Sequence, residues 1–351
     1  SKLAPEEIGL SALLLYGDRS VRHLQHSHDR IREFSKRAEA FMVEHHAEFE
    51  EKIGEIVNLI LCDYEKGRDI DQMDVFAQPD KAQVTNLVQK LMIVVFPGYY
   101  REKVYRSFND NNRLTMIMED VLYNLRKQIF LALRYQEDFA QATEIEMQRH
   151  AEEVCTKFFQ KIPKIREFIN TDIQATFDGD PASLSKAEIV LCYPGLFATS
   201  VNRLAHELYL LNVPLIPRMM TEYAHGLTGI DINPGAKIGK YFMIDHGTGV
   251  VIGETAEIGC HVKVYQGVTI GALSTREGQE LRGRKRHPTI HDNVTIYSGA
   301  SILGGETVIG RDAVIGGNVF ITSSIKPGTR VSVKNQELVY RNDDEACFRC
   351  D

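Results

Sequence analysis

The sequence DINPGAKIGKYFMIDHGTGVVIGETAEIGCHVKVYQGVTIG, residues 231–271, opens a stretch in which a branched aliphatic residue returns every six positions. The stretch runs from Asp231 to Lys326, and glycine often follows the aliphatic residue. A six-residue period fits neither the turn of an α-helix nor the alternation of a simple strand. It is typical of a hexapeptide β-helix, in which each hexad forms one short strand and one turn of a triangular coil. The expected inward-facing positions are Ile232, Ile238, Ile244, Val250, Ile252, Ile258, Val264, Ile270, Ile290, Ile296, Ile302, Val308, Val314 and Phe320.

Two interruptions of the repeat are the natural places to look for function. The phase slips by two residues between Ile244 and Ile252, and a polar, basic segment at residues 272–289 separates Ile270 from the next hexads. Loops on a rigid repeat scaffold are where binding residues concentrate. Each interruption contains a histidine, at positions 246 and 287. Either histidine could instead be a turn residue without a chemical role.

Several of these runs closely resemble the serine O-acetyltransferase family. They are residues 231–239, 244–256, 266–271 and 286–290, together with the upstream element Asp180-Pro181-Ala182. The resemblance implies an α+β protein, with an all-α N-terminal region followed by a left-handed parallel β-helix built from hexapeptide repeats. It also implies homotrimers, or dimers of trimers, in which acetyl-CoA and serine meet between neighbouring β-helices.

Residues before about 229 show helical apolar spacing in place of the hexad period. The spacing predicts one long helix or two abutting helices over residues 31–60. Further helices are expected at Lys81–Val95, Arg113–Arg134, Thr143–Phe168, Lys186–Leu211 and Ile216–Gly226. The expected domains are a helical extension (1–140), the helical domain of the family (141–229), the catalytic β-helix (230–332, with loop 272–289) and a C-terminal tail (333–351).

The resemblance assigns the catalytic pair. The hydroxyl of serine is a poor nucleophile, so a base must take its proton during attack on the thioester. By resemblance His246 is that base, and Asp231 is the carboxylate that orients its ring. The two residues are 15 positions apart, close to the length of one coil, so they could stack on adjacent coils near one corner. Asp231 could also be a plain turn residue before Asn233-Pro234.

The resemblance also supplies partners for both charged groups of serine. Arg286 and His287 match the residues that receive the carboxylate, because a guanidinium suits a planar carboxylate. Asp180 and Asp245 match the acids that receive the ammonium group, and Glu254 is a more distant candidate. Asp180 could alternatively cap a helix or form a turn.

Acetyl-CoA should lie in the groove between coils, held largely by backbone groups. A backbone N–H near Gly271-Ala272 is the expected donor to the oxyanion. Hexapeptide turns need small residues in any case, which is the alternative explanation for these positions. The basic part of loop 272–289 could meet the phosphates of CoA or could simply be solvated. The expected acetyl-CoA positions are Gly271, Ala272, Ser298, Gly299, Gly316 and Gly317.

Composition limits the partners. The net charge of −7 and the lack of a larger basic face argue against nucleic acid, and no apolar run approaches the 18 residues of a membrane span. Six scattered cysteines favour reduced thiols and a cytoplasmic protein. The tail ends in Cys350-Asp351 and lacks the C-terminal isoleucine through which many family members bind O-acetylserine sulfhydrylase. That cysteine synthase complex is therefore doubtful, whereas feedback inhibition by L-cysteine would use the serine site itself.

Other functions remain open at this point. The same fold could acetylate a sugar or another amino acid, although a neutral sugar would need no charged partners at both ends. A γ-carbonic-anhydrase-like zinc protein would draw ligands from His246, His261, His287 and His291. The spacing of these histidines does not match that family, and the acid–base pair requires no metal. A scaffold without activity is the last alternative.

Overall fold

The structure is a computed structural model that describes residues 18–71, 74, 77–100 and 110–334. The chain divides into two compact units, Ser1–Val75 and Phe76–Asp351. The predicted tail beyond residue 334, with Cys350 and Asp351, lies outside the described residues. Among the helices that are described, none is both long and apolar enough to cross a membrane.

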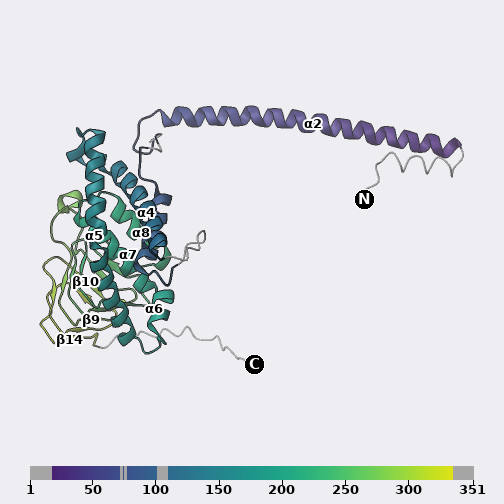
Figure 1. The fold of residues 1–351 in the computed structure, drawn as a ribbon. Helices are drawn as coiled ribbons and strands as arrows, with labels where there is room; N and C mark the ends of the chain where they lie inside the picture. The colour runs from purple at the N-terminus through teal and green to yellow at the C-terminus, as the bar shows by residue number, and fades with distance from the viewer. Residues whose placement is uncertain (1–17, 72–73, 75–76, 101–109, 335–351) are drawn as a thin grey trace, which may run out of the picture. The chain divides into compact units, whose positions relative to one another are not determined.

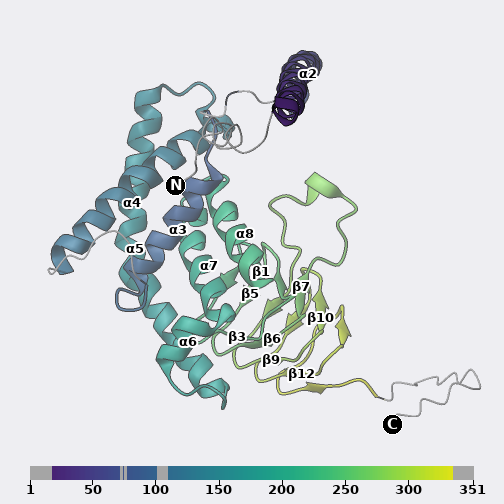
Figure 2. The ribbon, with the colours of Figure 1, turned by 90° about the vertical axis from the view of Figure 1, so that its right-hand side faces the viewer.

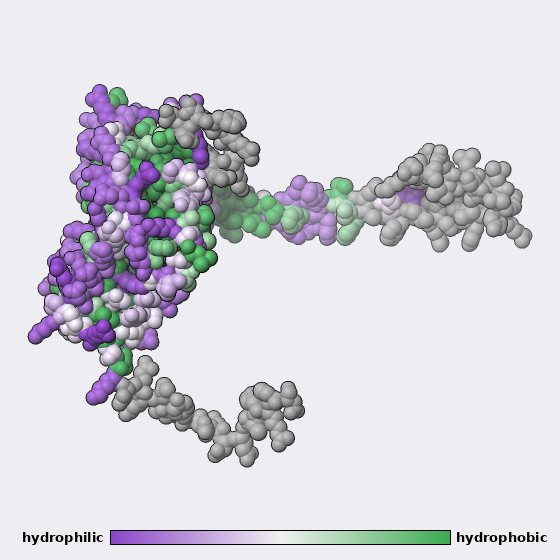
Figure 3. Space-filling model, turned by 60° about the horizontal axis from the view of Figure 1, so that its bottom comes forward, coloured by the Kyte–Doolittle hydropathy of each residue, from purple (hydrophilic) through white to green (hydrophobic). Residues whose placement is uncertain are grey.

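The described residues of the first unit include one long helix, α2 (Asp18–Tyr64, 47 residues) (Figure 1). The expected helix over residues 31–60 is therefore confirmed as one continuous element. Its apolar side chains, including Phe49, Ile53 and Ile56, are exposed within the chain, and Figure 3 shows hydrophobic and hydrophilic residues side by side along its coloured part. Ion pairs one turn apart, such as Arg37 with Glu33, add a few tenths of a kcal/mol each.

The second unit begins with helices that follow the sequence prediction closely. They are α3 (Lys81–Val95), α4 (Asp110–Leu133), the 3₁₀ turn η1 (Glu137–Phe139), α5 (Glu144–Gly179), α6 (Lys186–Cys192), α7 (Pro194–Leu210) and α8 (Ile216–Thr228). The helix α5 continues past its predicted end at Phe168 to Gly179. The single helix predicted over 186–211 is wrong, because Pro194 lacks a backbone N–H and starts a new helix as its first residue.

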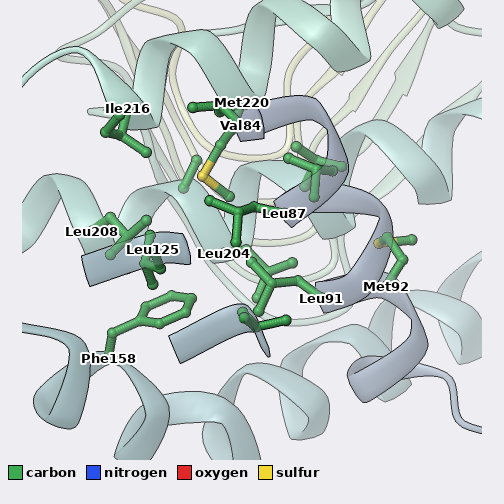
Figure 4. Close-up of a cluster of buried hydrophobic side chains, with 14 of the residues drawn as sticks. Val84, Leu87, Leu91, Met92, Leu125, Phe158, Leu204, Leu208, Ile216 and Met220 are labelled. Carbon is green, nitrogen blue, oxygen red and sulfur yellow. The ribbon is translucent and has the colours of Figure 1, made fainter. Parts of the chain in front are cut away.

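These helices share one apolar core, drawn in Figure 4. Leu87 and Leu91 of α3 pack with Leu125 of α4, Phe158 of α5 and Leu204 of α7, all nearly inaccessible to solvent. The segment 81–133 is therefore part of the same compact unit as the helices that follow it. The domain boundary expected near residue 140 stays a prediction.

Parallel strands then stack into the three sheets of a left-handed β-helix (Figure 2). Sheet A contains β1, β4, β7, β10 and β13; sheet B contains β2, β5, β8 and β11; and sheet C contains β3, β6, β9, β12 and β14. The strands are β1 (Asp231–Ile232), β2 (Lys237–Ile238), β3 (Met243–Asp245), β4 (Val251–Ile252), β5 (Glu257–Ile258), β6 (Lys263–Tyr265), β7 (Thr269–Gly271), β8 (Thr289–Ile290), β9 (Thr295–Ile296), β10 (Ser301–Leu303), β11 (Val308–Ile309), β12 (Val314–Ile315), β13 (Phe320–Ile321) and β14 (Arg330–Val331).

The inward positions agree with the hexad prediction up to Ile302 and then shift by one residue. Ile309, Ile315 and Ile321 are buried, whereas Phe320 is 70% exposed. The prediction that Val308, Val314 and Phe320 point inward is therefore wrong. The reason is a third slip in the turn after β10, where Gly304 adopts a φ of 103° and accommodates one extra residue.

A buried ion pair joins the helices to the first coil of the β-helix. Arg203 of α7 binds both carboxylate oxygens of Asp172 of α5, at 2.6 and 2.8 Å. The same guanidinium donates to the carbonyls of Ile238 and Gly239, and Asp172 also accepts the N–H of Phe242. Each charge thus has several partners, which is the condition under which burying it is tolerated.

Candidate active site

His246 lies at the corner where sheet C passes into sheet A, which we call the His246 corner (residues 246–250). The residue has a φ of 57°, and Gly247 follows with a φ of 86°. A Cβ on Gly247 would lie 2.4 Å from the side chain of Ile230, so this tight turn requires glycine. The backbone thereby holds the His246 side chain outward, where it is 71% exposed.

Two of the predicted acids gather around His246. Asp245 Oδ1 is 3.9 Å from His246 Nε2. Asp180 follows α5 and accepts hydrogen bonds from the hydroxyl of Tyr193 at 2.6 Å and from the N–H of Ala182 at 2.9 Å. These two hydrogen bonds, with smaller contributions from the charges of His246 and Lys263, lower the pKa of Asp180. Asp180 is therefore a charged carboxylate beside His246.

Asp180 is not a helix N-cap, because it follows the last residue of α5 and Ser185 caps α6. The alternative turn role is real, since the hydrogen bond from Ala182 closes a local turn. Sequence reasoning did not find Tyr193. The sequence marks Tyr193 only by its position before Pro194, because the residue before a proline disfavours the helical conformation.

Asp231 lies against the same corner, but it does not stack on His246. Its N–H donates to the carbonyl of Val250 at 2.9 Å, and its register partner on the next coil is Val251, 20 residues later. The predicted stacking is wrong, because the slip at residues 245–249 lengthens this coil. In the described chain Asp231 and His246 share no hydrogen bond; Asp231 Oδ1 accepts one from Arg218 at 3.2 Å instead.

Arg218 also explains a cluster that could otherwise suit a metal ion. One ligand atom each from Glu222, His225 and Asp231 lie within 4.8 Å of one another. The guanidinium of Arg218 is paired with both Glu222 and Asp231, so it already supplies the positive charge there. The histidines of the zinc alternative do not converge within the chain, because His246, His261 and His287 lie at three different corners of the coil.

The other predicted substrate residues lie where sheet A passes into sheet B, which we call the Arg286 corner (residues 253–256 and 272–288). Arg286 forms an ion pair with Glu254, which also accepts a hydrogen bond from Tyr209 at 3.1 Å. Burial alone would raise the pKa of Glu254, but the hydrogen bonds from Arg286 and Tyr209 outweigh it and lower the pKa. Glu254 thus holds Arg286 in place as a charged partner.

His287 is buried at the Arg286 corner as a neutral ring. Its Nδ1 accepts the N–H of Thr255 at 3.0 Å, which leaves the proton on Nε2. Burial, followed by the positive charge of Arg286, lowers the pKa of His287 to about 4. Gly253 makes room for the ring, since a Cβ there would lie 2.0 Å from it. His287 can therefore donate a hydrogen bond but carries no charge near neutral pH.

The protein should lose stability as the pH falls from 6.5 to about 4, in part because of His287. In this range the unfolded histidine binds a proton and the folded one does not, so protonation favours unfolding. We expect the His287→Gln variant to show a flatter dependence of the free energy of unfolding on pH, measured by urea denaturation. The exposed His291→Gln variant should keep the slope of the parent. An unchanged slope in His287→Gln would contradict the buried neutral ring.

The predicted acetyl-CoA positions are divided between the two corners. Ser298 and Gly299 follow β9, and Gly316 and Gly317 follow β12, so all four lie on the same edge as His246 in later coils. Gly271 ends β7, and Ala272 begins the Arg286 corner. Gly299 has a φ of 70°, so the turn itself requires glycine there. The structural explanation therefore holds at Gly299, whether or not this residue also binds CoA.

The basic loop 272–288 projects from the stacked coils and carries the 3₁₀ turn η2 (Gly278–Leu281) (Figure 2). Arg276, Arg282 and Arg284 are exposed along it, and Arg284 lies 3.6 Å from Glu277. At its end Lys285 donates to the carbonyl of Thr255 at 2.6 Å. The loop is therefore anchored at the Arg286 corner, and its other arginines are exposed. This is compatible both with contact to the phosphates of CoA and with a loop that is simply solvated.

Known proteins with similar sequences are serine acetyltransferases. A protein of Synechococcus elongatus named "Serine acetyltransferase, plasmid" is 41% identical over 222 residues, which cover 62% of this chain and 70% of that protein. A serine acetyltransferase of Synechocystis is 47% identical over 123 residues, 35% of this chain and 47% of the relative. The chain thus spans about half the length of that second protein. No protein-family model matches the chain.

Solved structures agree with the sequence comparison. Serine acetyltransferase isoform 3 of Entamoeba histolytica, crystallised in complex with cysteine, is 36% identical with a TM-score of 0.61, over 74% of this chain and 84% of that one. Serine acetyltransferase 1 of the same organism, in complex with L-cysteine, is 34% identical with a TM-score of 0.60, over 70% and 86%. The chain belongs to the serine acetyltransferase family, and it is an acyltransferase.

Proposed function

We propose that this protein transfers the acetyl group of acetyl-CoA to the hydroxyl of L-serine, giving O-acetyl-L-serine and CoA for cysteine biosynthesis. The observation that carries the proposal is the grouping of Asp180, Asp245 and exposed His246 at one corner, with Arg286 and neutral His287 at another. These groups complement a small acceptor that bears an ammonium group, a carboxylate and a hydroxyl.

In the proposed reaction His246 takes the proton of the serine hydroxyl as its oxygen attacks the thioester carbonyl. The new C–O bond forms, the C–S bond breaks, and the imidazolium returns its proton to the departing thiolate. Asp180 and Asp245 hold the ammonium group, while Arg286 and His287 receive the carboxylate. We assign Asp231, whose N–H donates to the carbonyl of Val250 at this corner, as the carboxylate that orients the imidazole.

The distribution of these residues favours a site shared between subunits. One face of the coil separates the His246 corner from the Arg286 corner within a chain. In a cyclic trimer each interface is heterologous, so the His246 corner of one protomer can face the Arg286 corner of the next. We propose this arrangement, with acetyl-CoA lying in the groove between them along Ser298, Gly299 and the later turns.

L-Cysteine should compete for the same site, because it differs from serine only in its thiol and presents the same two charged groups. The two Entamoeba histolytica proteins were crystallised with cysteine, which supports this proposal. The chemistry described here uses only protein side chains and acetyl-CoA, and it needs no metal ion.

The direct test follows release of the CoA thiol from acetyl-CoA by the purified full-length chain. We expect release that depends on L-serine and is inhibited by L-cysteine. Release with a sugar or another amino acid, but not with serine, would keep the acyltransferase and overturn the acceptor. Absence of release with every acceptor would overturn the proposed activity.

A shared site should allow two inactive variants to rescue each other. The His246→Ala and Arg286→Ala variants each damage one half of the site, and co-assembled trimers restore both halves at some interfaces. With equal amounts of the two chains, about a quarter of the interfaces should pair an intact His246 with an intact Arg286. We expect co-expressed, differently tagged chains to recover about that fraction of the parent's CoA release.

Two mixtures provide the controls for this rescue. Chains mixed after separate purification, without subunit exchange, should stay inactive. Co-expression of His246→Ala with a double variant that lacks both residues should also show no recovery. If the first pair stays inactive despite verified co-assembly, both halves belong to one chain.

A further inference from the structure

We propose that Tyr193 is a positioning residue that fixes the Asp180 carboxylate and thereby sets the selectivity for acceptors with an ammonium group beside the hydroxyl. This inference rests on the proposed function and deepens it. Within the part of the chain that the structure describes, the Tyr193 side chain donates its one hydrogen bond to Asp180, at 2.6 Å. Tyr193 thus acts through Asp180 and not on the reacting atoms.

The two oxygens of Asp180 are each held by one donor. Tyr193 donates to Oδ2, and the N–H of Ala182 donates to Oδ1 at 2.9 Å. A carboxylate oxygen accepts two hydrogen bonds, so each oxygen keeps one acceptor site for the substrate. Without the tyrosine hydroxyl only the local turn would orient this half-buried side chain. The carboxylate could then rotate away from the acceptor.

The backbone of Tyr193 is itself tightly placed. Its N–H donates to the carbonyl of Ile189 in the last turn of α6, and its own carbonyl accepts the N–H of Phe197 in the first turn of α7. Two residues on, a Cβ at Gly195 would lie 2.2 Å from the carbonyl oxygen of Ile244, so α7 begins in direct contact with β3. Because β3 ends at Asp245 and His246 follows it directly, the Tyr193 hydroxyl is a donor fixed relative to the catalytic corner.

The charges around Tyr193 and Asp180 keep the tyrosine hydroxyl protonated and the carboxylate charged. Bonding to the Asp180 carboxylate, together with burial and the nearby Asp180, Glu188 and Asp245 charges, raises the pKa of Tyr193 to about 12. The hydroxyl therefore stays protonated under assay conditions, while Asp180 stays charged. The nearby Lys263 donates to the carbonyl of Gly179 at 2.6 Å, so it anchors the same turn from its other side.

The test compares L-serine with 3-hydroxypropionate, which has the same hydroxyl and carboxylate but no amine. In the Tyr193→Phe variant we expect the KM for L-serine to rise about tenfold, which corresponds to about 1.4 kcal/mol. The kcat for L-serine and the kcat/KM for 3-hydroxypropionate should change little. The preference for serine should therefore fall about tenfold, an effect that a loss of stability alone would not produce.

The Tyr223→Phe variant is the matched control, because it removes a tyrosine hydroxyl that accepts a hydrogen bond from Gln89 of α3 instead of donating one to Asp180. It should keep the parent's preference. In an Asp180→Asn background, adding Tyr193→Phe should cause little further loss, because Tyr193 would act through Asp180. Full additivity, or an unchanged preference in Tyr193→Phe, would overturn the inference. A parent chain that is inactive with serine would instead overturn the proposed function.

Discussion

Replacing His246 with alanine should lower kcat for serine acetylation by about 10³, within the 10²–10⁴ range of general-base catalysis. The exposed imidazole at the His246 corner is the base that we assign to the hydroxyl proton, and alanine offers no group in its place. The KM for L-serine should change far less, because Asp180, Asp245 and Arg286 hold the charged groups of the acceptor.

The measurement is the initial rate of CoA thiol release at saturating acetyl-CoA, with circular dichroism to verify folding. The His291→Ala variant is the control, because it removes an exposed histidine that follows β8, where sheet B passes into sheet C. It should retain the parent's kcat. A His246→Ala variant that keeps more than about a tenth of the parent's kcat would show that another group takes the proton.

Replacing Arg203 with methionine should destabilise the protein by about 3–5 kcal/mol, the cost of leaving a buried charge unpaired. The change removes both hydrogen bonds to Asp172, whose side chain is almost inaccessible to solvent. It also leaves the carbonyls of Ile238 and Gly239 without their donor. The helices and the first coil should then separate more easily.

Urea denaturation gives the free energy of unfolding for this comparison. The Lys237→Met variant, which breaks an exposed pair with Glu257, should cost less than about 1 kcal/mol. Adding Asp172→Asn to Arg203→Met should recover part of the loss, because the unpaired charge disappears. A loss below 1 kcal/mol in Arg203→Met would mean that water reaches Asp172 when its partner is gone.

The local pattern of the sequence was sufficient for most of the fold. The hexad period predicts the β-helix because the inward position of each hexad depends on that hexad alone. The bounds of α3 agree with the expected Lys81–Val95. Two features of the fold were missed, because a single residue causes each of them. The glycine turn at Gly304 shifts the phase of the later coils, and Pro194 divides one predicted helix into two.

The site was harder to predict, because it depends on contacts between distant segments. Asp180 meets Asp245 and His246 only because α5 ends beside sheet C, where Gly179 packs against Met243 and Lys263. Tyr193, between α6 and α7, contacts Asp180, and Arg218 of α8 contacts Asp231; the apolar pattern of this region gives no sign of either polar contact. The prediction that Asp231 stacks on His246 was wrong, because it assumed a coil of about 18 residues. The first coil is longer, and Asp231 pairs with Val251, 20 residues later.

The long excursion between β7 and β8 has a consequence for how such a protein can change over time. Glu257 and Thr289 are 32 positions apart, yet they pair in register on neighbouring coils, as residues 16–20 apart do where the loop does not intervene. Extra residues are thus expelled to the perimeter and leave the stacked interior undisturbed. Natural selection can lengthen, shorten or recharge this excursion at little cost to folding, and so can adjust the entrance to the site independently of the scaffold.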